Sequence, residues 1–202
     1  MDMATEPWIQ EKSVIRTAVR AQRRAQDAGD RMERSRAITR TLLGREEYQK
    51  ARTLLVYLSN KEEVATDELV ARALAEGKRV WVPVMDRETR DLRISELPGP
   101  GVKFRYGPYG IREPETEFLK FVSVDQADLV ILPGVAFDRQ GGRIGYGKGY
   151  FDRLLNRLDP RVPRVALAFD FQVLDTVPQS GHDERVSLII TEKSIMDCSG
   201  IE

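Results

Sequence analysis

The sequence predicts an α/β fold, organised as a single three-layer domain with a mostly parallel sheet and N-terminal helices. The first observation is that short apolar runs typical of buried strands alternate with segments of helical periodicity. The second is composition: 202 residues, 41% of them hydrophobic and 32% charged, are typical of one globular domain with a sizeable core. We therefore expect one domain over residues 1–202.

In the N-terminal half, the segment from Trp8 to about Lys50 lacks proline and is expected to form two helices with a break near "DAGD". Strands are expected at 53–58 ("TLLVYL") and 79–84 ("RVWVPV"), joined by a helix over 66–78 that ends at Gly77. A weaker strand candidate is 91–97. The Gly/Pro-rich segment 97–114 is expected to be a long functional or mobile loop.

In the C-terminal half, 127–138 ("ADLVILPGVAFD") is the clearest candidate for a buried strand. A helix is expected at 149–158 ("GYFDRLLNRL"), because its leucines share one face. Further strands are expected at 164–169 and 187–192. In parallel sheets of this kind, ligands bind beyond the carboxyl ends of the strands.

Composition and charge exclude several classes of protein. The formal net charge is zero, so no overall field favours nucleic acid or a membrane surface. No apolar run approaches 18 residues, and a single cysteine, Cys198, excludes a disulfide framework. We expect a cytoplasmic monomer without membrane or nucleic-acid partners.

A glycine-rich loop, "GGRIGYGKGYFDR" at 141–153, follows the clearest strand and leads into a helix. It resembles a P-loop up to Lys148, but Gly149 stands where a P-loop has Ser or Thr. Two interpretations remain: an exposed turn in which glycines supply positive φ, or an anion site of backbone N–H groups. The position of the loop and the cations Arg143 and Lys148 favour a phosphate ligand.

Asp152, at the end of this loop, also has two interpretations. A carboxylate is a suitable oxygen ligand for Mg²⁺. The same carboxylate near a helix N-terminus also compensates the positive end of the helix dipole.

The segment "LPGVAFDRQGGRIGYGKGYFDRLL" resembles the signature of the 5-formyltetrahydrofolate cyclo-ligase family, whose members are also called methenyltetrahydrofolate synthetases. Similar stretches extend along nearly the whole chain. They are "KSVIR" (12–16), "YLSNKEEVAT" (57–66), "GIREP" (110–114), "ALAF" (166–169), "HDERV" (182–186) and "TE" (191–192).

The resemblance implies a reaction in which ATP and 5-formyltetrahydrofolate give 5,10-methenyltetrahydrofolate, ADP and phosphate, with Mg²⁺ as cofactor. In the family's scheme the γ-phosphoryl group is transferred to the formyl oxygen, and N10 then displaces phosphate. Such chemistry requires positioning and charge neutralisation more than a protein nucleophile.

The resemblance also implies roles for particular residues. Leu58 and Glu63 match positions that contact the folate, and Asp152 and Asp183 match Mg²⁺ ligands. Arg143, Lys148 and Asp152 are the residues expected to act in phosphoryl transfer. The residues expected to bind ATP are Lys12, Arg16, Arg143, Ile144, Gly145, Tyr146, Gly147, Lys148, Gly149, Tyr150 and Phe151.

Two features admit other interpretations. Ser187 stands where many family members have an aspartate, so the expected Mg²⁺ site lacks one carboxylate that many family members have nearby. Lys12, Arg16, Arg20 and Arg24 form a basic stripe on one helical face, which is typical of a solvated surface, of an ATP-phosphate site at its N-terminal end, or of a nucleic-acid surface. The alternative functions are accordingly an ATP-binding enzyme of the same fold with another acceptor, and nucleic-acid binding through these helices.

Overall fold

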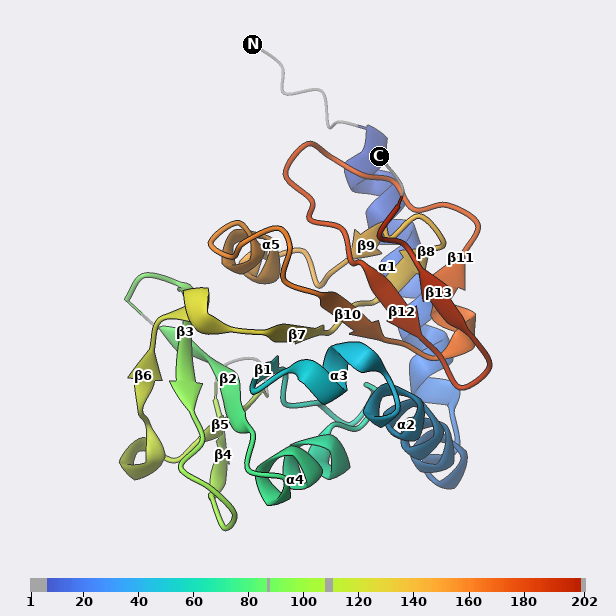
Figure 1. Cartoon of the computed structure of the whole chain (residues 1–202). Helices are drawn as coiled ribbons and strands as arrows, with labels where there is room; N and C mark the ends of the chain where they lie inside the picture. The colour runs from blue at the N-terminus through green and yellow to red at the C-terminus, as the bar shows by residue number, and fades with distance from the viewer. Residues whose placement is uncertain (1–6, 87, 108–110, 201–202) are drawn as a thin grey trace.

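The centre of the protein is a mixed sheet whose inner strands are parallel (Figure 1). The computed structural model describes residues 7–86, 88–107 and 111–200; Gly110, the first residue of "GIREP", lies outside them. Within the described residues the main sheet has the strand order β13-β12-β10-β7-β1-β2-β3-β6. The five strands from β12 to β2 run parallel, and β13, β3 and β6 are antiparallel to their neighbours.

The strands follow the apolar runs of the sequence. The parallel strands are β1 (Thr53–Val56), β2 (Arg79–Asp86), β7 (Leu129–Leu132), β10 (Arg164–Leu167) and β12 (Leu188–Ile190). The antiparallel edge strands are β3 (Asp91–Glu96), β6 (Phe121–Val122) and β13 (Ile195–Asp197). The weak candidate at 91–97 is thus a strand.

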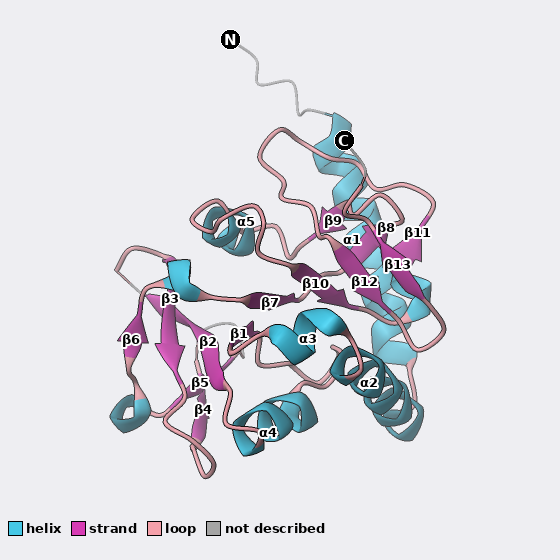
Figure 2. Ribbon diagram, viewed as in Figure 1, coloured by secondary structure: helices cyan, strands magenta, loops and turns pink. Residues whose placement is uncertain are grey.

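Helices cover both faces of this sheet, as Figure 2 shows. The helices are α1 (Pro7–Ala25), α2 (Ala28–Leu43), α3 (Glu46–Lys50), α4 (Asp67–Ala75) and α5 (Tyr150–Leu155). Because side chains alternate along a strand, Leu54 and Val56 pack with α2, α3 and α4, whereas Leu55 packs with α5 on the opposite face. The expected three-layer α/β architecture is therefore confirmed.

The N-terminal helices break where the sequence indicates. Asp27 is the N-cap of α2, and its side chain accepts hydrogen bonds from the backbone N–H groups of Gly29 and Asp30. The expectation of only two helices before residue 50 was wrong, because Gly44 ends α2 and the short α3 follows.

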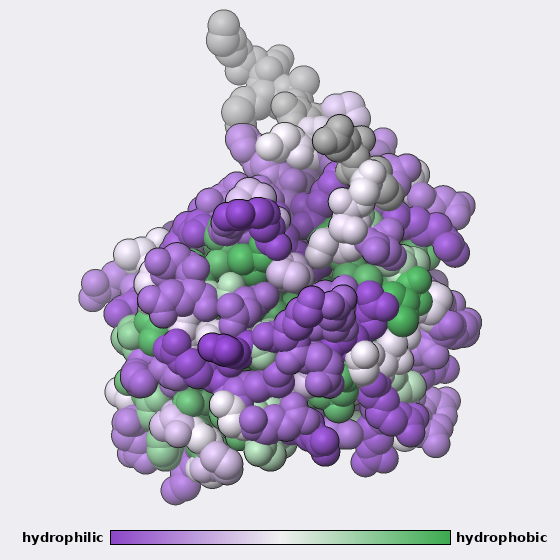
Figure 3. Space-filling view, in the orientation of Figure 1, coloured by the Kyte–Doolittle hydropathy of each residue, from purple (hydrophilic) through white to green (hydrophobic). Residues whose placement is uncertain are grey.

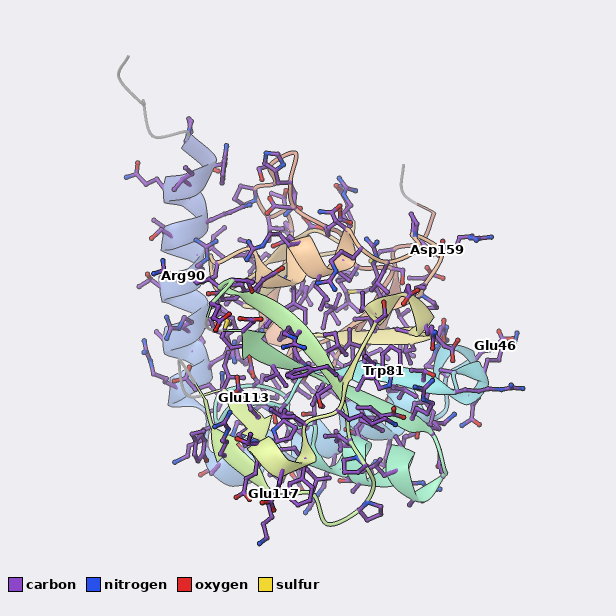
Figure 4. All side chains as sticks on the ribbon, turned by 90° about the vertical axis from the view of Figure 1, so that its left-hand side faces the viewer. Glu46, Trp81, Arg90, Glu113, Glu117 and Asp159 are labelled. Atoms are coloured by element: carbon purple, nitrogen blue, oxygen red, sulfur yellow. The ribbon has the colours of Figure 1, made fainter. Side chains whose placement is uncertain are left out.

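Two other expectations need correction. Segment 127–138 is not one strand: it breaks at Pro133 and Gly134, and β8 (Ala136–Asp138) belongs to a second sheet. A Cβ on Gly134 would lie 2.2 Å from the Phe137 ring, so glycine permits this close turn. The Gly/Pro-rich segment holds a hairpin of β4 (Phe104–Tyr106) and β5 (Arg112–Pro114), in which the buried Glu113 accepts from the backbone N–H of Met85 at 2.9 Å (Figure 4).

The second sheet, of order β11-β8-β9, lies beyond the carboxyl ends of the main strands. It consists of β8, β9 (Arg143–Ile144) and β11 (Val173–Leu174). Val19 of α1 packs with Ala136 and Ile144 of this sheet. The packing places α1 and the glycine-rich loop at the edge where parallel sheets bind ligands.

Replacing Leu54 by alanine is expected to lower the free energy of unfolding by about 2–5 kcal/mol. Leu54 is fully buried in β1, at the centre of the sheet. The neighbouring strands are held by the sheet and cannot move to fill the cavity that the substitution creates. Chemical denaturation measures the effect. Val14→Ala, at a position that is 64% exposed, is the control and is expected to change stability little; equal effects would contradict this placement.

Figure 3 shows a mostly hydrophilic face with scattered hydrophobic residues. Among the described residues, no helix combines the length and the apolar character that crossing a membrane requires.

Candidate active site

The glycine-rich loop connects β9 to α5. Gly147 and Gly149 have φ values of 90° and 66°, in the left-handed region that favours glycine. α5 begins at Tyr150, next to the expected start at Gly149, but it ends at Leu155 rather than at Leu158 and has six residues. A helix this short contributes little dipole, so the anion-binding capacity of the loop depends on its backbone N–H groups and on neighbouring cations.

Helix α1 brings two of these cations to the loop. The Arg16 Nε donates to the Gly145 carbonyl oxygen at 2.8 Å. Lys12 is 3% exposed, and its ammonium group forms an ion pair with Asp183, which lies 171 residues away in the sequence. The expectation that Lys12 and Arg16 reach one site is therefore consistent with the structure.

Arg143 and Asp152 form the second pair of charges. The Arg143 Nη2 donates to the Asp152 Oδ1 at 2.5 Å, and the Arg143 side chain is only 2% exposed. The backbone N–H of Glu184 donates to the same oxygen at 3.2 Å, which places segment 183–184 beside Asp152. The buried Arg143 Nε has no hydrogen-bond partner among the described residues, so it is a donor suited to a phosphate oxygen.

Within the described residues, each of the two aspartates uses only one carboxylate oxygen for hydrogen bonds. Asp183 uses Oδ2 for Lys12 and for Ser180, and Asp152 uses Oδ1. Burial of Asp183 opposes its ionisation, but the hydrogen bonds from Lys12 and Ser180 outweigh this effect, so its pKa lies below the ordinary value.

The residues present fit Mg²⁺ bound together with a polyphosphate. In the described part of the chain there is no cluster of three or more His, Cys, Asp or Glu side chains that forms a metal cage. Two aspartates, each with a second oxygen that no described residue engages, match the few carboxylates that Mg²⁺ uses beside phosphate oxygens and water.

Ser187 has a structural role in this conformation. Its hydroxyl accepts from the backbone N–H of Arg164 at 2.9 Å and donates to the Arg164 carbonyl oxygen at 3.2 Å. Because Ser187 is thereby bound to the start of β10, the structure gives no support to a role for it beside Asp152.

The expected folate residues lie after β1. Leu58 and Glu63 are both buried, at 6% and 7% exposure. The Glu63 Oε2 accepts from the backbone N–H of Asn60 at 2.8 Å, and Oε1 accepts from the Tyr146 hydroxyl at 2.6 Å. Burial and then the charge of Glu63 raise the pKa of Tyr146, so the phenol remains a donor. Tyr146 thus connects the glycine-rich loop to Glu63.

Sequence reasoning missed the buried Arg23, which lies on α1 beside Glu63. Its Nη2 is 3.8 Å from the Glu63 Oε1, and its guanidinium lies 5.8 Å from the centre of the Tyr146 ring. The basic residues of α1 carry no signal that separates Arg23 from its exposed neighbours Arg20 and Arg24. Packing of α1 on the second sheet decides which of them is buried.

Together, these residues bring three cations, two carboxylates and a further buried carboxylate that accepts hydrogen bonds to one edge of the sheet. Gly147 and Lys148 are exposed, Gly149 is half-buried, and Tyr150 and Phe151 begin α5. Such a site suits the binding of a nucleotide next to a second substrate with hydrogen-bond donors.

Comparisons with known proteins identify the family. The model of the 5-formyltetrahydrofolate cyclo-ligase family matches residues 8–192. The chain is 28% identical to the 5-formyltetrahydrofolate cyclo-ligase of Mus musculus, with 91% of this chain and 94% of that protein covered. It is 29% identical to the enzyme of the same name from Mycolicibacterium smegmatis, with 90% and 94% covered.

A solved structure agrees with these matches. The NMR structure of the 5,10-methenyltetrahydrofolate synthetase of Aquifex aeolicus superposes with a TM-score of 0.81 at 29% identity, and 93% of this chain and 92% of that chain are covered. The sequence signature, the fold and the match over most of the chain lead to one conclusion: the protein is a member of the 5-formyltetrahydrofolate cyclo-ligase family of enzymes.

Proposed function

We propose that this protein catalyses the ATP- and Mg²⁺-dependent cyclisation of 5-formyltetrahydrofolate to 5,10-methenyltetrahydrofolate, with release of ADP and phosphate. The observation that carries the proposal is that Arg16 and Arg143 lie at the glycine-rich loop. The Lys12–Asp183 ion pair lies beside Asp152, and the buried Glu63 is hydrogen-bonded to Tyr146 of the loop. The names of the relatives support the same reaction.

In the proposed mechanism the loop and its cations hold the ATP phosphates. Arg143 and Lys148 neutralise charge on the γ-phosphoryl group while it is transferred to the formyl oxygen and ADP departs. The N10 nitrogen of the folate then attacks the activated carbon, loses its proton, and phosphate leaves with the former formyl oxygen. No protein nucleophile is required.

Asp152 and Asp183 would hold Mg²⁺ through the carboxylate oxygens that no described residue engages. When bound, Mg²⁺ supplies charge neutralisation at the phosphate oxygens. The ion pairs of these aspartates with Arg143 and Lys12 fix the orientation of both carboxylates.

Leu58 and Glu63 would hold the folate. The reduced pterin ring carries amino and N–H donors, and Glu63 is a buried acceptor for them. Leu58 contributes apolar contact beside it.

Mixing the protein with Mg-ATP and 5-formyltetrahydrofolate is expected to produce the absorbance band of the methenyl product. Omitting ATP, or adding a chelator of Mg²⁺, is expected to abolish the signal. ATP binding without any methenyl product would instead indicate an enzyme of the same fold that uses a different acceptor.

A further inference from the structure

Arg23 is a buried cation with one unused donor. Its Nε donates to the Glu62 carbonyl oxygen at 2.8 Å, and its Nη1 donates to the Gly134 carbonyl oxygen at 3.4 Å. The side chain is 1% exposed, yet Nη2 has no hydrogen-bond partner among the described residues. Buried polar groups are nearly always hydrogen-bonded, so an unused buried N–H group requires an explanation.

Arg23 lines a narrow recess at the carboxyl ends of the central strands. Tyr57 follows β1, Gly134 follows β7 and Leu167 ends β10, and these residues line the recess with Arg23 and Glu63. The chain extends in opposite directions across the sheet from β1 and β7, so the recess lies at the topological switch point, where open α/β sheets bind ligands.

The recess presents an acceptor and a donor side by side. The Glu63 Oε1 and the Arg23 Nη2 are 3.8 Å apart. The amide of the neighbouring Gln172 is already engaged: its Nε2 donates to the Gly134 and Val135 carbonyl oxygens, and its Oε1 accepts from the backbone N–H of Phe169. Arg23 is therefore the donor that remains for a ligand beside Glu63.

Tyr146 covers this pair of charges in the present conformation. The Tyr146 hydroxyl donates to Glu63, and the Tyr146 ring lies against the Arg23 guanidinium. A flat ligand ring with a polar edge could make the same two contacts. The recess does not admit even a water molecule as it stands, so a pterin ring requires Tyr146 to move away from Glu63. Tyr146 is 43% exposed and stands between Gly145 and Gly147, which permits such a movement.

We propose that Arg23 and Glu63 together recognise the lactam edge of the pterin ring, once Tyr146 has turned away. In this ring N3–H and the 2-amino group are donors, and the oxygen on C4 is an acceptor next to N3. Glu63 accepts from the donors, and the Arg23 Nη2 donates to the C4 oxygen. This inference rests on the proposed folate substrate and adds a residue that determines its recognition.

The test combines a change in the residue with a change in the ligand. The ligands are 5-formyltetrahydrofolate and its 4-deoxy analogue, in which hydrogen replaces the oxygen on C4 and N3 consequently carries no hydrogen. Because each ligand is compared between the variant and the unmodified protein, the lost N3–H donor affects both proteins alike. Arg23→Gln is expected to weaken binding of 5-formyltetrahydrofolate about 10- to 100-fold, the effect of losing one charge-assisted hydrogen bond. Binding of the 4-deoxy analogue is expected to change less than about threefold, and ATP affinity is expected to remain unchanged.

Arg24→Gln is the matched control, because Arg24 is exposed on the same helix. Arg23→Lys preserves the positive charge beside Glu63 and replaces the glutamine variant if that variant does not fold. It is expected to lose less affinity for 5-formyltetrahydrofolate, with the same dependence on the C4 oxygen. Thermal unfolding of each variant establishes that binding is measured on folded protein.

Equal losses for both ligands, or no loss for either, would overturn the inference and leave Arg23 with a structural role. This outcome differs from a failure of the proposed function, in which the unmodified protein itself neither binds nor cyclises 5-formyltetrahydrofolate.

Discussion

Replacing Asp152 by asparagine is expected to lower kcat at least about 100-fold. Loss of residues that only orient metal ligands costs about 10- to 100-fold, and a direct ligand is expected to cost at least as much. The asparagine carbonyl oxygen can still accept from Arg143, but its amide then presents N–H donors where the carboxylate presents an oxygen to Mg²⁺. Steady-state kinetics over a range of Mg²⁺ concentrations, with free metal calculated, measure the effect.

The same substitution removes the anionic partner of Arg143, whose side chain is 2% exposed, so a lower unfolding temperature is also expected. Activity must therefore be measured well below that temperature. Asp159→Asn is the control, because Asp159 follows α5 and its ion-pair partner, Arg161, is 90% exposed. Full activity of the folded Asp152→Asn variant would show that the metal assignment is wrong.

Replacing Glu63 by glutamine is expected to raise KM for 5-formyltetrahydrofolate about 10- to 100-fold, with KM for ATP nearly unchanged. The buried carboxylate accepts hydrogen bonds with a full negative charge, and such bonds are worth more than neutral ones. Glutamine also leaves the Arg23 charge, 3.8 Å away, without compensation. Separate titrations of 5-formyltetrahydrofolate and of ATP measure the two Michaelis constants.

Glu68→Gln on α4 is the control for this prediction, since its side chain is 55% exposed and faces Arg36 at 3.8 Å. It is expected to leave both Michaelis constants unchanged. A change in Glu63→Gln that affected only ATP would refute a folate role for this residue.

Much of the site could be predicted because local sequence carries its chemistry. The glycines at 147 and 149 indicate positive φ, and the structure places both there. Arg143, Lys12, Arg16, Glu63 and Asp183 were all expected from family motifs, and the structure brings them to one edge of the sheet. Their roles in binding ATP, metal and folate stay predictions that the experiments above test.

Other features depend on contacts between distant segments. The pairing of Lys12 with Asp183 joins the first helix to the C-terminal region, and no local pattern specifies it. The apolar run 127–138 divides between two sheets, because β7 pairs with β1 and β10 whereas β8 pairs with β9 and β11.

The sequence by itself determined the α/β class, most of the strands and the position of the glycine-rich loop, because apolar periodicity and glycine placement act over a few residues. Only the tertiary structure decided that Arg23 is buried beside Glu63 while Arg20 and Arg24 remain exposed on the same helix. Which face of α1 is covered depends on its packing against the second sheet, and that sheet forms only when β8, β9 and β11 come together from separate parts of the chain.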